Sequence, residues 1–378
     1  MKKIFASAIM LLVVLFNTFT VYATDLRDIY AKGAVVINGQ TGEVLFEQNA
    51  YEKLPMASTT KIMSALLALE SGNLDEKFTV DSQAIKVEGS SMGLKEGDIV
   101  TLRDLCCGML LPSGNDAANC TAVRVAGSAD KFVEMMNEKA KELGMYSTHF
   151  VTPSGLDDDT DEHYSTAYDM AILTKAAMEN PDFREICGCD KIKLCFGNPP
   201  FDRWLVNTNK LLKNCEGVVG VKTGFTDKAK RCLVSACNRK GVTLICVTLN
   251  DPDDWEEHSA LYDYCFNFLA EQKLPISSKK FTVNVVGGEC DEIECSTDTA
   301  TAVILNGRAK EVTAKIYLPG FVYAPIQKGD KVGKVEYYYK NVKVAEKDIL
   351  ADKGAEYEKS EKPDLFEYYF EKIKGIFD

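Results

Sequence analysis

The sequence is short of positive charge. Its 378 residues include 44 lysines and arginines against 56 aspartates and glutamates, which gives a formal net charge of −12 and a pI of about 5.0. A protein that binds nucleic acid needs a basic face for the phosphates, so we expect no nucleic acid as a partner. With 46% hydrophobic and 26% charged residues, the chain is instead typical of a globular protein with a sizeable core, and its length predicts two domains.

Metal-ligand motifs are also missing. The 13 cysteines include no pair of C-x-x-C motifs with the spacing of a zinc site, so we expect neither a metal nor a cofactor. An odd number of cysteines cannot all pair. Cys187 and Cys189, and likewise Cys290 and Cys295, are close enough in sequence for local disulfides. Many of the others lie in apolar runs, as Cys106 does, and are expected to be small core residues.

The sequence has three histidines and no G-x-S-x-G turn between a strand and a helix, because its one match, Gly89–Gly93, lies in a Gly-rich, irregular stretch. That turn marks a large class of serine hydrolases with a histidine base, so a Ser-His-Asp site built on His149, His163 or His258 is disfavoured. We expect His163 to anchor a loop. A serine hydroxyl is a weak nucleophile at neutral pH, so a nucleophilic serine in this chain needs a different base.

An apolar stretch at the N-terminus indicates export. Met1-Lys2-Lys3 is positively charged, residues 4–19 are mostly apolar, and Val21-Tyr22-Ala23 offers small residues for cleavage. We predict a signal peptide over residues 1–23, with an uncleaved N-terminal anchor as the alternative. The mature protein is then expected outside the cytoplasm, associated with the cell wall or membrane. All the cysteines follow the signal, so unpaired thiols would fit an anoxic habitat.

Residues 24–274 predict one α+β domain. Hairpins are expected over residues 34–47 and 232–249, and helices over 58–70, 102–110, 116–125, 128–143, 167–178 and 253–271. A hairpin, a group of helices, a second hairpin and a last helix predict an antiparallel sheet covered by helices.

The pattern changes from Pro275 onward. Residues 275–352 are short runs of alternating apolar residues separated by Gly and Asn turn signals, which predicts a small all-β domain. Residues 353–361 are a charged linker, and residues 362–378 predict an amphipathic C-terminal helix with an aromatic-rich face. Such a helix is expected to lie on a membrane surface. A helix packed on the β domain is the alternative, because the helix is not basic.

The pattern S-x-x-K occurs three times. Ser58 and Lys61 begin an apolar helix, and residues three apart share a helix face, so the hydroxyl and the amine can meet. An amine in apolar surroundings loses its charge more readily than in water, which makes it a suitable base. The match at Ser128 is explained by a helix cap, and the match at Ser277 lies in the linker between domains.

Two further motifs follow in order. Ser113-Gly114-Asn115 is a tight break between helices, able to aim a hydroxyl and an amide into a cleft, and Lys222-Thr223-Gly224 lies at the edge of the predicted sheet. S-x-x-K, S-x-N and K-T-G together are typical of class A β-lactamases and penicillin-binding proteins. With Leu111–Ala118, His163–Ala167 and Gly220–Thr226, the chain resembles the low-molecular-weight penicillin-binding proteins that are D-alanyl-D-alanine carboxypeptidases. The resemblance covers nearly the whole mature chain.

The resemblance implies a penicillin-binding, β-lactamase-like transpeptidase fold and a reaction through an acyl-enzyme. Ser58 would attack the carbonyl between the two terminal D-alanines of a peptidoglycan stem peptide, while Lys61 takes its proton. Ser113 would complete the catalytic set, relaying protons or supporting charge with Lys222 across the cleft. β-Lactam antibiotics would acylate the same serine.

The resemblance also assigns binding roles. Asn115 would hold the substrate amide, Thr223 the terminal carboxylate, and the backbone N–H groups of Ser58 and Phe225 the oxyanion. Together, the expected substrate-binding residues are Asn115, Lys222, Thr223 and Gly224.

One stretch departs from the family pattern. Some members carry an arginine near the start of the strand that follows K-T-G, where it helps to hold the terminal carboxylate, and here Thr243 occupies that place. Recognition would then rest on Thr223 and Lys222, with or without help from Arg231. A D,D-endopeptidase, a β-lactamase and a non-enzymatic penicillin-binding scaffold remain as alternatives, although Glu162 lacks the E-x-x-L-N setting of β-lactamases.

Overall fold

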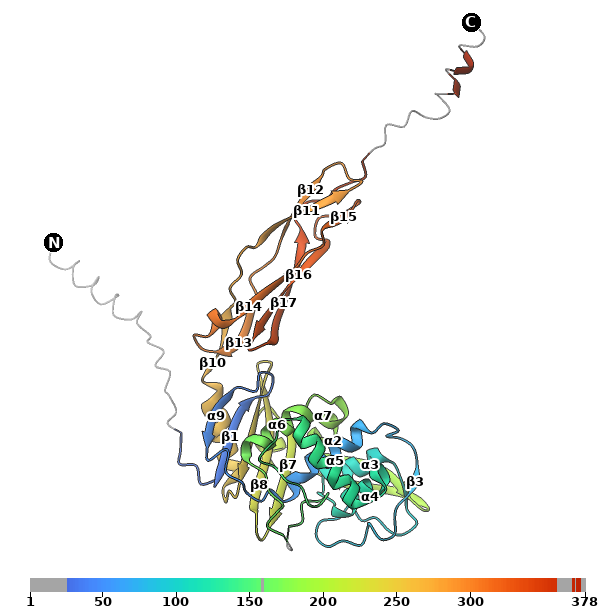
Figure 1. Cartoon of the computed structure of the whole chain (residues 1–378), viewed down its shortest axis with the longest axis vertical. Helices are drawn as coiled ribbons and strands as arrows, with labels where there is room; N and C mark the ends of the chain where they lie inside the picture. The colour runs from blue at the N-terminus through green and yellow to red at the C-terminus, as the bar shows by residue number, and fades with distance from the viewer. Residues whose placement is uncertain (1–25, 158–159, 359–368, 371, 375–378) are drawn as a thin grey trace, which may run out of the picture. The chain divides into compact units, whose positions relative to one another are not determined.

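The computed structural model describes residues 26–157, 160–358, 369–370 and 372–374 (Figure 1). The chain forms two compact units. The first unit contains Met1–Val36, Leu45–Cys237 and Ile245–Asn267; the second contains Ile37–Val44, Asn238–Leu244 and Phe268–Asp378. The predicted signal peptide and most of the predicted C-terminal helix lie outside the described residues.

A five-stranded sheet has the strand order β2-β1-β9-β8-β7. Its strands are β1 (Gly33–Asn38), β2 (Val44–Gln48), β7 (Val218–Thr226), β8 (Lys230–Arg239) and β9 (Val242–Leu249). Both predicted hairpins are therefore present. β7 is the edge strand and pairs with β8 in antiparallel register, so one side of β7 is left free of a neighbouring strand in this sheet.

The helices of the first unit pack around one buried helix. A short 3-10 turn, η1 (Ala57–Thr60), leads into α2 (Lys61–Glu70), whose residues from Lys61 to Leu69 are all buried. α2 packs against α3 (Leu102–Leu110), α4 (Asn115–Ala126) and α6 (Ala167–Ala177). The prediction that the serine begins a central helix is confirmed. The remaining helices are α5 (Ala129–Glu142), α7 (Pro181–Gly188), α8 (Leu211–Asn214) and α9 (Asp254–Phe266).

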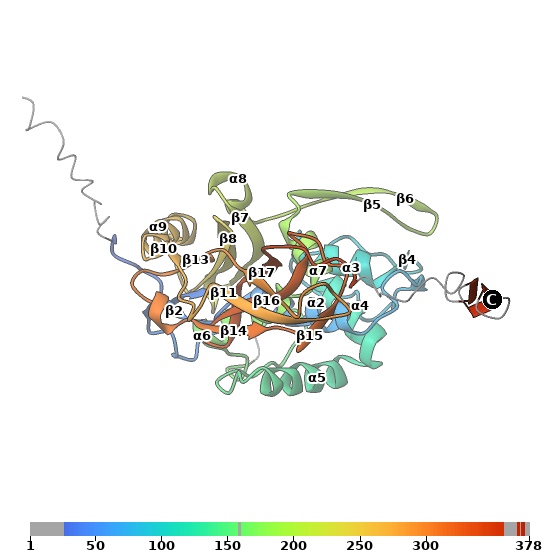
Figure 2. The same ribbon diagram turned by 90° about the horizontal axis from the view of Figure 1, so that it is seen from above.

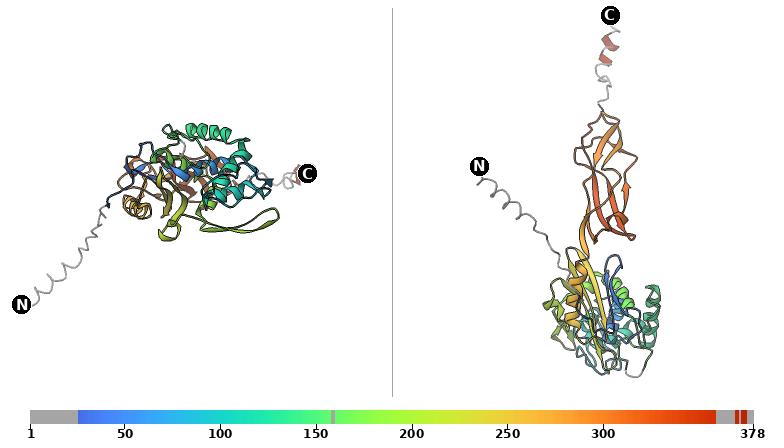
Figure 3. Two further views of the ribbon diagram at one scale, coloured as in Figure 1. Left: turned by 90° about the horizontal axis from the view of Figure 1, so that it is seen from below. Right: turned by 90° about the vertical axis from the view of Figure 1, so that its left-hand side faces the viewer.

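Two small strand pairs complete the first unit. β3 (Phe78–Thr79) pairs with β4 (Ile99–Val100), and β5 (Lys191–Gly197) pairs with β6 (Pro200–Val206). The β5–β6 hairpin runs along one side of the unit and α5 along the opposite side (Figures 2 and 3).

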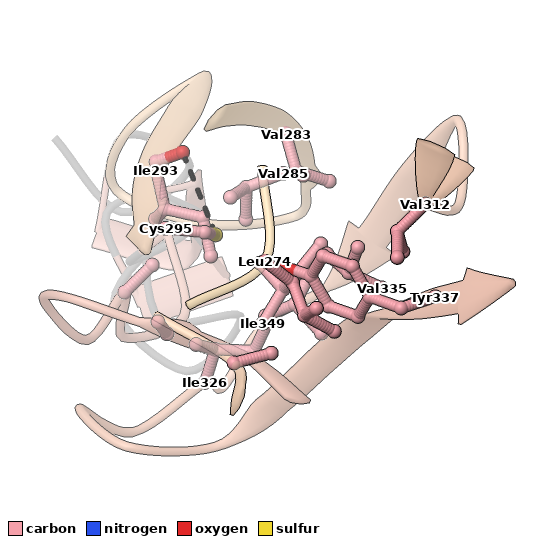
Figure 4. Close-up of a cluster of buried hydrophobic side chains, with 14 of the residues drawn as sticks. Leu274, Val283, Val285, Ile293, Cys295, Val312, Ile326, Val335, Tyr337 and Ile349 are labelled. Carbon is pink, nitrogen blue, oxygen red and sulfur yellow. Dashed lines mark hydrogen bonds between the residues drawn. The ribbon is translucent and has the colours of Figure 1, made fainter. Parts of the chain in front are cut away.

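The second unit is an all-β domain, as predicted. Its six-stranded sheet has the order β14-β16-β17-β12-β11-β15. These strands are β11 (Lys280–Val286), β12 (Glu292–Ser296), β14 (Thr313–Tyr317), β15 (Phe321–Tyr323), β16 (Lys331–Tyr339) and β17 (Val342–Ala351), with a short 3-10 turn η2 (Ala309–Glu311). Val283, Ile293, Val335, Tyr337 and Ile349 are buried in its core (Figure 4).

One element boundary was predicted wrongly. The last helix of the α+β domain was expected to continue to Glu271, but α9 ends at Phe266 and Leu269–Lys273 form strand β10. β10 pairs with β13 (Thr301–Leu305), which lies about thirty residues further along the chain. This long-range pairing overrides the local helical pattern, which is a weak guide where tertiary contacts compete.

Neither local cysteine pair forms a disulfide. The Cys187 thiol is buried against the carbonyl of Val219, and the Cys189 thiol faces the carbonyl of Glu185. Cys295 is buried in the core of the second unit, while Cys290 lies in a turn. The side chains of each pair therefore serve local packing.

Within the described part of the chain, no helix is long and apolar enough to cross a bilayer.

Candidate active site

Ser58 lies in a turn whose backbone is held from several directions. Ala57 has a φ of 49°, a left-handed conformation that non-glycine residues rarely adopt. Thr60 Oγ1 donates a 2.8 Å hydrogen bond to the Ala57 carbonyl. Gly155 packs so closely that a Cβ there would lie 2.0 Å from the Ala57 carbonyl oxygen. The turn therefore presents Ser58, which is half-buried, in a fixed position.

Lys61 is completely buried and makes three close contacts. Its Nζ lies 2.8 Å from Ser58 Oγ, 2.7 Å from Asn115 Oδ1 and 2.6 Å from the Ser154 carbonyl oxygen. Burial, together with the nearby charge of Lys222, holds the pKa of Lys61 well below its ordinary value, although Asp116 opposes the shift. The sequence predicted the contact with Ser58, but not the carbonyl of Ser154.

These contacts fit a neutral amine. The Asn115 amide oxygen and the Ser154 carbonyl can only accept hydrogen bonds, so they take the two N–H groups that a neutral amine has. The remaining lone pair of Lys61 then faces Ser58 Oγ, whose O–H can donate to it. The geometry is that of a serine hydroxyl next to a base.

The Ser113-Gly114-Asn115 segment joins α3 to α4 by a strained turn. Ser113 has a φ of 67° and is buried. A Cβ on Gly114 would lie 2.7 Å from Asp116 Oδ1 and 2.9 Å from the Met92 backbone nitrogen, so only glycine fits there. The predicted break between helices is confirmed.

Both ends of the Asn115 side chain have protein partners. Its Oδ1 accepts from Lys61, and its Nδ2 donates a 2.7 Å hydrogen bond to the carbonyl of Glu88. The next residue, Asp116, accepts hydrogen bonds from the backbone nitrogens of Met92, Gly93 and Leu94. Asp116 thus fixes the loop that borders the site, a role that no sequence pattern indicated.

The K-T-G residues lie on the edge strand β7. Lys222 is fully buried, its Nζ donates to the Thr223 carbonyl at 2.7 Å, and burial lowers its pKa to about 7. Thr223 Oγ1 lies 2.7 Å from Thr208 Oγ1. A Cβ on Gly224 would lie 3.1 Å from the Met56 carbonyl and 3.2 Å from the Ser58 nitrogen. Glycine at this position therefore lets β7 approach the serine turn.

A cavity of about 370 Å³ opens beside Ser58. Its wall brings together residues from well-separated parts of the sequence: Ser58, Ser90, Ser113, Thr208, Lys210, Thr223, Gly224, Phe225, Arg231, Asp254 and Trp255. Of the predicted site residues, Lys61, Asn115 and Lys222 do not line the cavity, but each is hydrogen-bonded to a residue of the site: Lys61 to Ser58, Asn115 to Lys61, and Lys222 to the Thr223 carbonyl. Ser90, Thr208 and Lys210 are additions that the sequence did not suggest.

Arg231 is held in place at the wall of the cavity. One guanidinium nitrogen lies 2.5 Å from Asp254 Oδ1, and the guanidinium carbon lies 5.3 Å from the centre of the Trp255 ring. Burial raises the pKa of Asp254, although Arg231 opposes the shift. Thr243, in contrast, accepts a hydrogen bond from the Asn238 side chain and does not line the cavity.

The three histidines make no contact with Ser58 in the described structure. His163 Nδ1 accepts from the backbone nitrogen of Val151, which leaves Nε2–H to donate to Thr60 Oγ1 at 2.9 Å. His163 therefore anchors the loop behind the serine turn, as expected, and burial lowers its pKa to about 4. His258 is buried elsewhere, against Ser235 and Thr248. Among the described residues, no group of His, Cys, Asp and Glu could hold a metal.

Sequence comparison identifies the family. The family described as D-alanyl-D-alanine carboxypeptidase matches residues 18–253. The chain belongs to this family. The family described as the C-terminal domain of penicillin-binding protein 5 matches residues 271–357. The protein is thus a serine-type D-Ala-D-Ala carboxypeptidase, a hydrolase that acts on peptidoglycan peptides and binds β-lactams.

Curated relatives and solved structures agree with this assignment. The carboxypeptidase is 35% identical to D-alanyl-D-alanine carboxypeptidase DacF of Bacillus subtilis over 314 residues, which covers 80% of each chain. It is 32% identical to DacC of Escherichia coli over 345 residues, with 86% of this chain and 84% of the relative covered. The Streptomyces K15 DD-transpeptidase superposes with a TM-score of 0.61 at 32% identity, over 64% of this chain and 98% of that one.

Proposed function

We propose that this carboxypeptidase removes the terminal D-alanine of peptidoglycan stem peptides through an acyl-enzyme on Ser58, with Lys61 as the base. The observation that carries the proposal is the 2.8 Å contact between Lys61 Nζ and Ser58 Oγ, made by a lysine whose other two contacts are acceptors.

The first step moves one proton and forms one bond. Lys61 takes the Ser58 proton as Oγ attacks the carbonyl carbon between the two D-alanines. The resulting oxyanion is stabilised by the backbone N–H groups of Ser58 and Phe225, which are brought near each other by the close approach of Gly224. Such donors contribute roughly 3–4 kcal/mol each to lowering the barrier.

The second step breaks the peptide bond. The leaving amine of D-alanine needs a proton, and it receives the one that Lys61 took from Ser58, passed on with the help of Ser113 and Lys222, so that Lys61 is neutral again. Lys222, with a pKa of about 7, exchanges a proton readily near neutral pH. Water then hydrolyses the ester on Ser58 and restores the hydroxyl.

Arg231 is proposed to bind the terminal carboxylate together with Thr223. Its guanidinium lines the same cavity as Ser58 and is fixed by Asp254. Charge-assisted hydrogen bonds from arginine to a carboxylate are strong and directional. This assignment would make the enzyme select free C-termini, as a carboxypeptidase must. Arg231 would also supply the positive charge that is missing where some family members have an arginine and this chain has Thr243.

The alternative functions have less support. Glu162 is exposed, with its backbone rather than its side chain engaged by His149, so it offers no fixed base for the fast deacylation of a β-lactamase. A non-enzymatic scaffold would not need a buried lysine against Ser58. An endopeptidase would use the same catalytic residues but would have to accept a larger leaving group beside Arg231.

We also propose that the protein acts outside the cytoplasm. The predicted signal peptide over residues 1–23 supports export, and the predicted amphipathic helix over residues 362–378 supports contact with a membrane surface. Liposome co-sedimentation of the mature protein, with and without residues 362–378, tests that contact. Equal binding by the two forms would reject the helix as an anchor.

The proposed reaction is tested by incubating the mature protein with a pentapeptide that ends in D-Ala-D-Ala and measuring released D-alanine. The wild type should release it, and Ser58→Ala should lose at least a thousandfold in rate, because the nucleophile is gone. Absence of D-alanine release by a folded wild type would reject the reaction.

A further inference from the structure

The β5–β6 hairpin leads into the segment that lines the cavity beside Ser58. Arg203 ties it to the neighbouring loop: one guanidinium nitrogen donates to the Gly93 carbonyl at 2.6 Å, and the other lies 3.0 Å from Asp98 Oδ2. The same guanidinium stacks within about 4 Å of the rings of Phe196 and Phe201, at 4.1 Å and 4.2 Å. The hairpin, which forms a separate two-stranded sheet, is visible along one side of the unit in Figures 2 and 3.

One face of this hairpin exposes apolar side chains. Trp204 is 59% exposed and Val206 is 56% exposed, whereas Leu205 between them is buried. This alternation is that of a strand with one face packed and one face free. Exposed apolar side chains that cluster on a soluble protein commonly mark a binding surface.

The exposed face continues into the catalytic cavity. Beyond Val206 the alternation persists, because Thr208 and Lys210 are exposed while Asn209 is buried. Thr208 and Lys210 both line the cavity beside Ser58. We name Trp204 and Val206, with the segment that leads from the end of β6 to Thr208, the ledge. At the rise of a strand, Trp204 lies about 13 Å along the chain from Thr208.

Two lysines flank the ledge. In the register of the hairpin, Lys191 lies opposite Val206 and Lys193 opposite Trp204. Lys191 Nζ is 5.1 Å from the centre of the Trp204 ring, and Lys193 pairs with Asp202. In a protein with a formal net charge of −12, an aromatic ring beside a lysine amine suits a ligand that combines apolar ring faces, hydroxyl groups and acidic substituents.

We propose that the ledge binds the carbohydrate strand of peptidoglycan. The C–H faces of sugar rings stack on exposed indole rings, and Lys191 can donate to sugar oxygens or pair with the carboxylates of neighbouring stem peptides. A five-residue stem extends at most about 17 Å, comparable to the length of the ledge, so sugar and scissile bond can be held on the same molecule. The inference rests on the proposed function, since the ledge serves the polymer whose peptide ends enter the cavity.

The test compares Trp204→Ala with Tyr146→Ala, which removes an 84% exposed ring four residues after α5, the helix that runs along the opposite side of the unit. For both variants of the mature protein, D-alanine release is measured from a soluble pentapeptide and from isolated peptidoglycan, and binding to the peptidoglycan is measured by co-sedimentation. Loss of the stacking ring should weaken binding and release on the polymer by about five- to tenfold, with release from the soluble peptide unchanged. Tyr146→Ala should match the wild type in all measurements.

A competition experiment identifies the occupant. Glycan strands stripped of their peptides should displace the wild type from peptidoglycan and should fail to bind Trp204→Ala. Equal activity of Trp204→Ala and wild type on the polymer, equal losses on both substrates, or competition by free stem peptide but not by stripped glycan would overturn the inference. A wild type that binds stripped glycan but releases no D-alanine from the pentapeptide would instead reject the proposed reaction.

Discussion

The surroundings of Lys61 suit the role of base that we propose for its amine. Its three partners, Ser58, Asn115 and the Ser154 carbonyl, carry no charge, and the side chain is completely buried. Burial therefore favours the neutral form, and the positive charge of Lys222 reinforces this.

Changing Lys222 should move the pH dependence of acylation. Lys61 must be neutral to accept a proton, so acylation falls as the pH drops through its pKa. Below its own pKa of about 7, Lys222 is charged and lowers the pKa of Lys61. Lys222→Ala removes that charge, so the pKa of Lys61 should rise and the acidic limb of the normalised acylation profile should shift to higher pH. The measurement is the rate of penicillin acylation across pH, with the exposed Lys141→Ala as control. A shift to lower pH would contradict the explanation.

Removing Arg231 should weaken recognition of the free C-terminus. For Arg231→Ala, KM for the pentapeptide should rise roughly ten- to hundredfold with a smaller change in kcat, because a charge-assisted hydrogen bond to the carboxylate is lost. Arg231→Lys should recover part of the loss. A C-terminally amidated peptide is the matched control: the wild type should discriminate against it, and Arg231→Ala should not. Unchanged discrimination would assign the carboxylate to other residues.

The side chains proposed for catalysis and binding were predictable where a motif carries them. Ser58, Lys61, Ser113, Asn115 and Lys222 come from three short patterns whose spacing reflects a helix face, a helix break and a strand. The others could not be predicted, because they act through the fold. Ser154 contributes a backbone carbonyl, which has no residue signature, and Thr208 reaches the cavity only through its position after β6.

Among the elements, the loop that follows α5 supports the serine turn from behind. Gly155 has a φ of 88°, and its missing Cβ makes room for the Ala57 carbonyl. The neighbouring Ser154 carbonyl orients Lys61, and His163 anchors the loop to Thr60. The position of the nucleophile thus depends on a segment that carries no catalytic side chain.

Gly155→Ala should lower both stability and acylation. The added Cβ would lie 2.0 Å from the Ala57 carbonyl, so the turn that holds Ser58 must shift. Small displacements of a reacting group cost about a hundredfold in rate. Gly127→Ala is the matched control, because Gly127 also has a positive φ of 81° but nothing within 4 Å of the added Cβ. Both variants should lower Tm through backbone strain, and Gly155→Ala alone should lose acylation. Equal acylation by the two variants would show that the contact does not position Ser58.

The elements themselves were largely predictable from periodicity and caps. Thr101 and Ser128 cap α3 and α5 as their sequences suggest. The boundary after α9 was not predictable, because β10 forms through its pairing with the distant strand β13. The position of the β5–β6 hairpin was not predictable either, because it depends on contacts of Arg203 with residues that are remote in sequence.

At the scale of the whole molecule, the residues of the cavity beside Ser58 and the core of the all-β second unit are separate. Every residue that lines the catalytic cavity belongs to the first unit. The second unit has its own buried cluster, centred on Tyr337, Val335 and Ile349 (Figure 4). A substitution in this cluster should therefore lower the stability of the second unit without changing the cavity beside Ser58.

Tyr337→Ala should destabilise the second unit alone. Tyr337 is completely buried, and truncating a buried aromatic ring costs roughly 3 kcal/mol through lost burial and the cavity left behind. Thermal unfolding should show an earlier transition, while the rate of D-alanine release from a soluble pentapeptide at 25 °C stays at the wild-type value. Tyr323→Ala, at a ring that is 67% exposed, should leave both unchanged. Loss of activity in a folded Tyr337→Ala protein would contradict the separation.

The acyl-enzyme on Ser58 is tested most directly by trapping it. The mature protein is incubated with a labelled penicillin, digested, and analysed by mass spectrometry, beside Ser58→Ala. A lasting adduct, one per molecule, should be found on the peptide that contains Ser58, and Ser58→Ala should carry none. An adduct on another residue, or hydrolysed penicillin with no adduct that persists, would contradict the proposed mechanism.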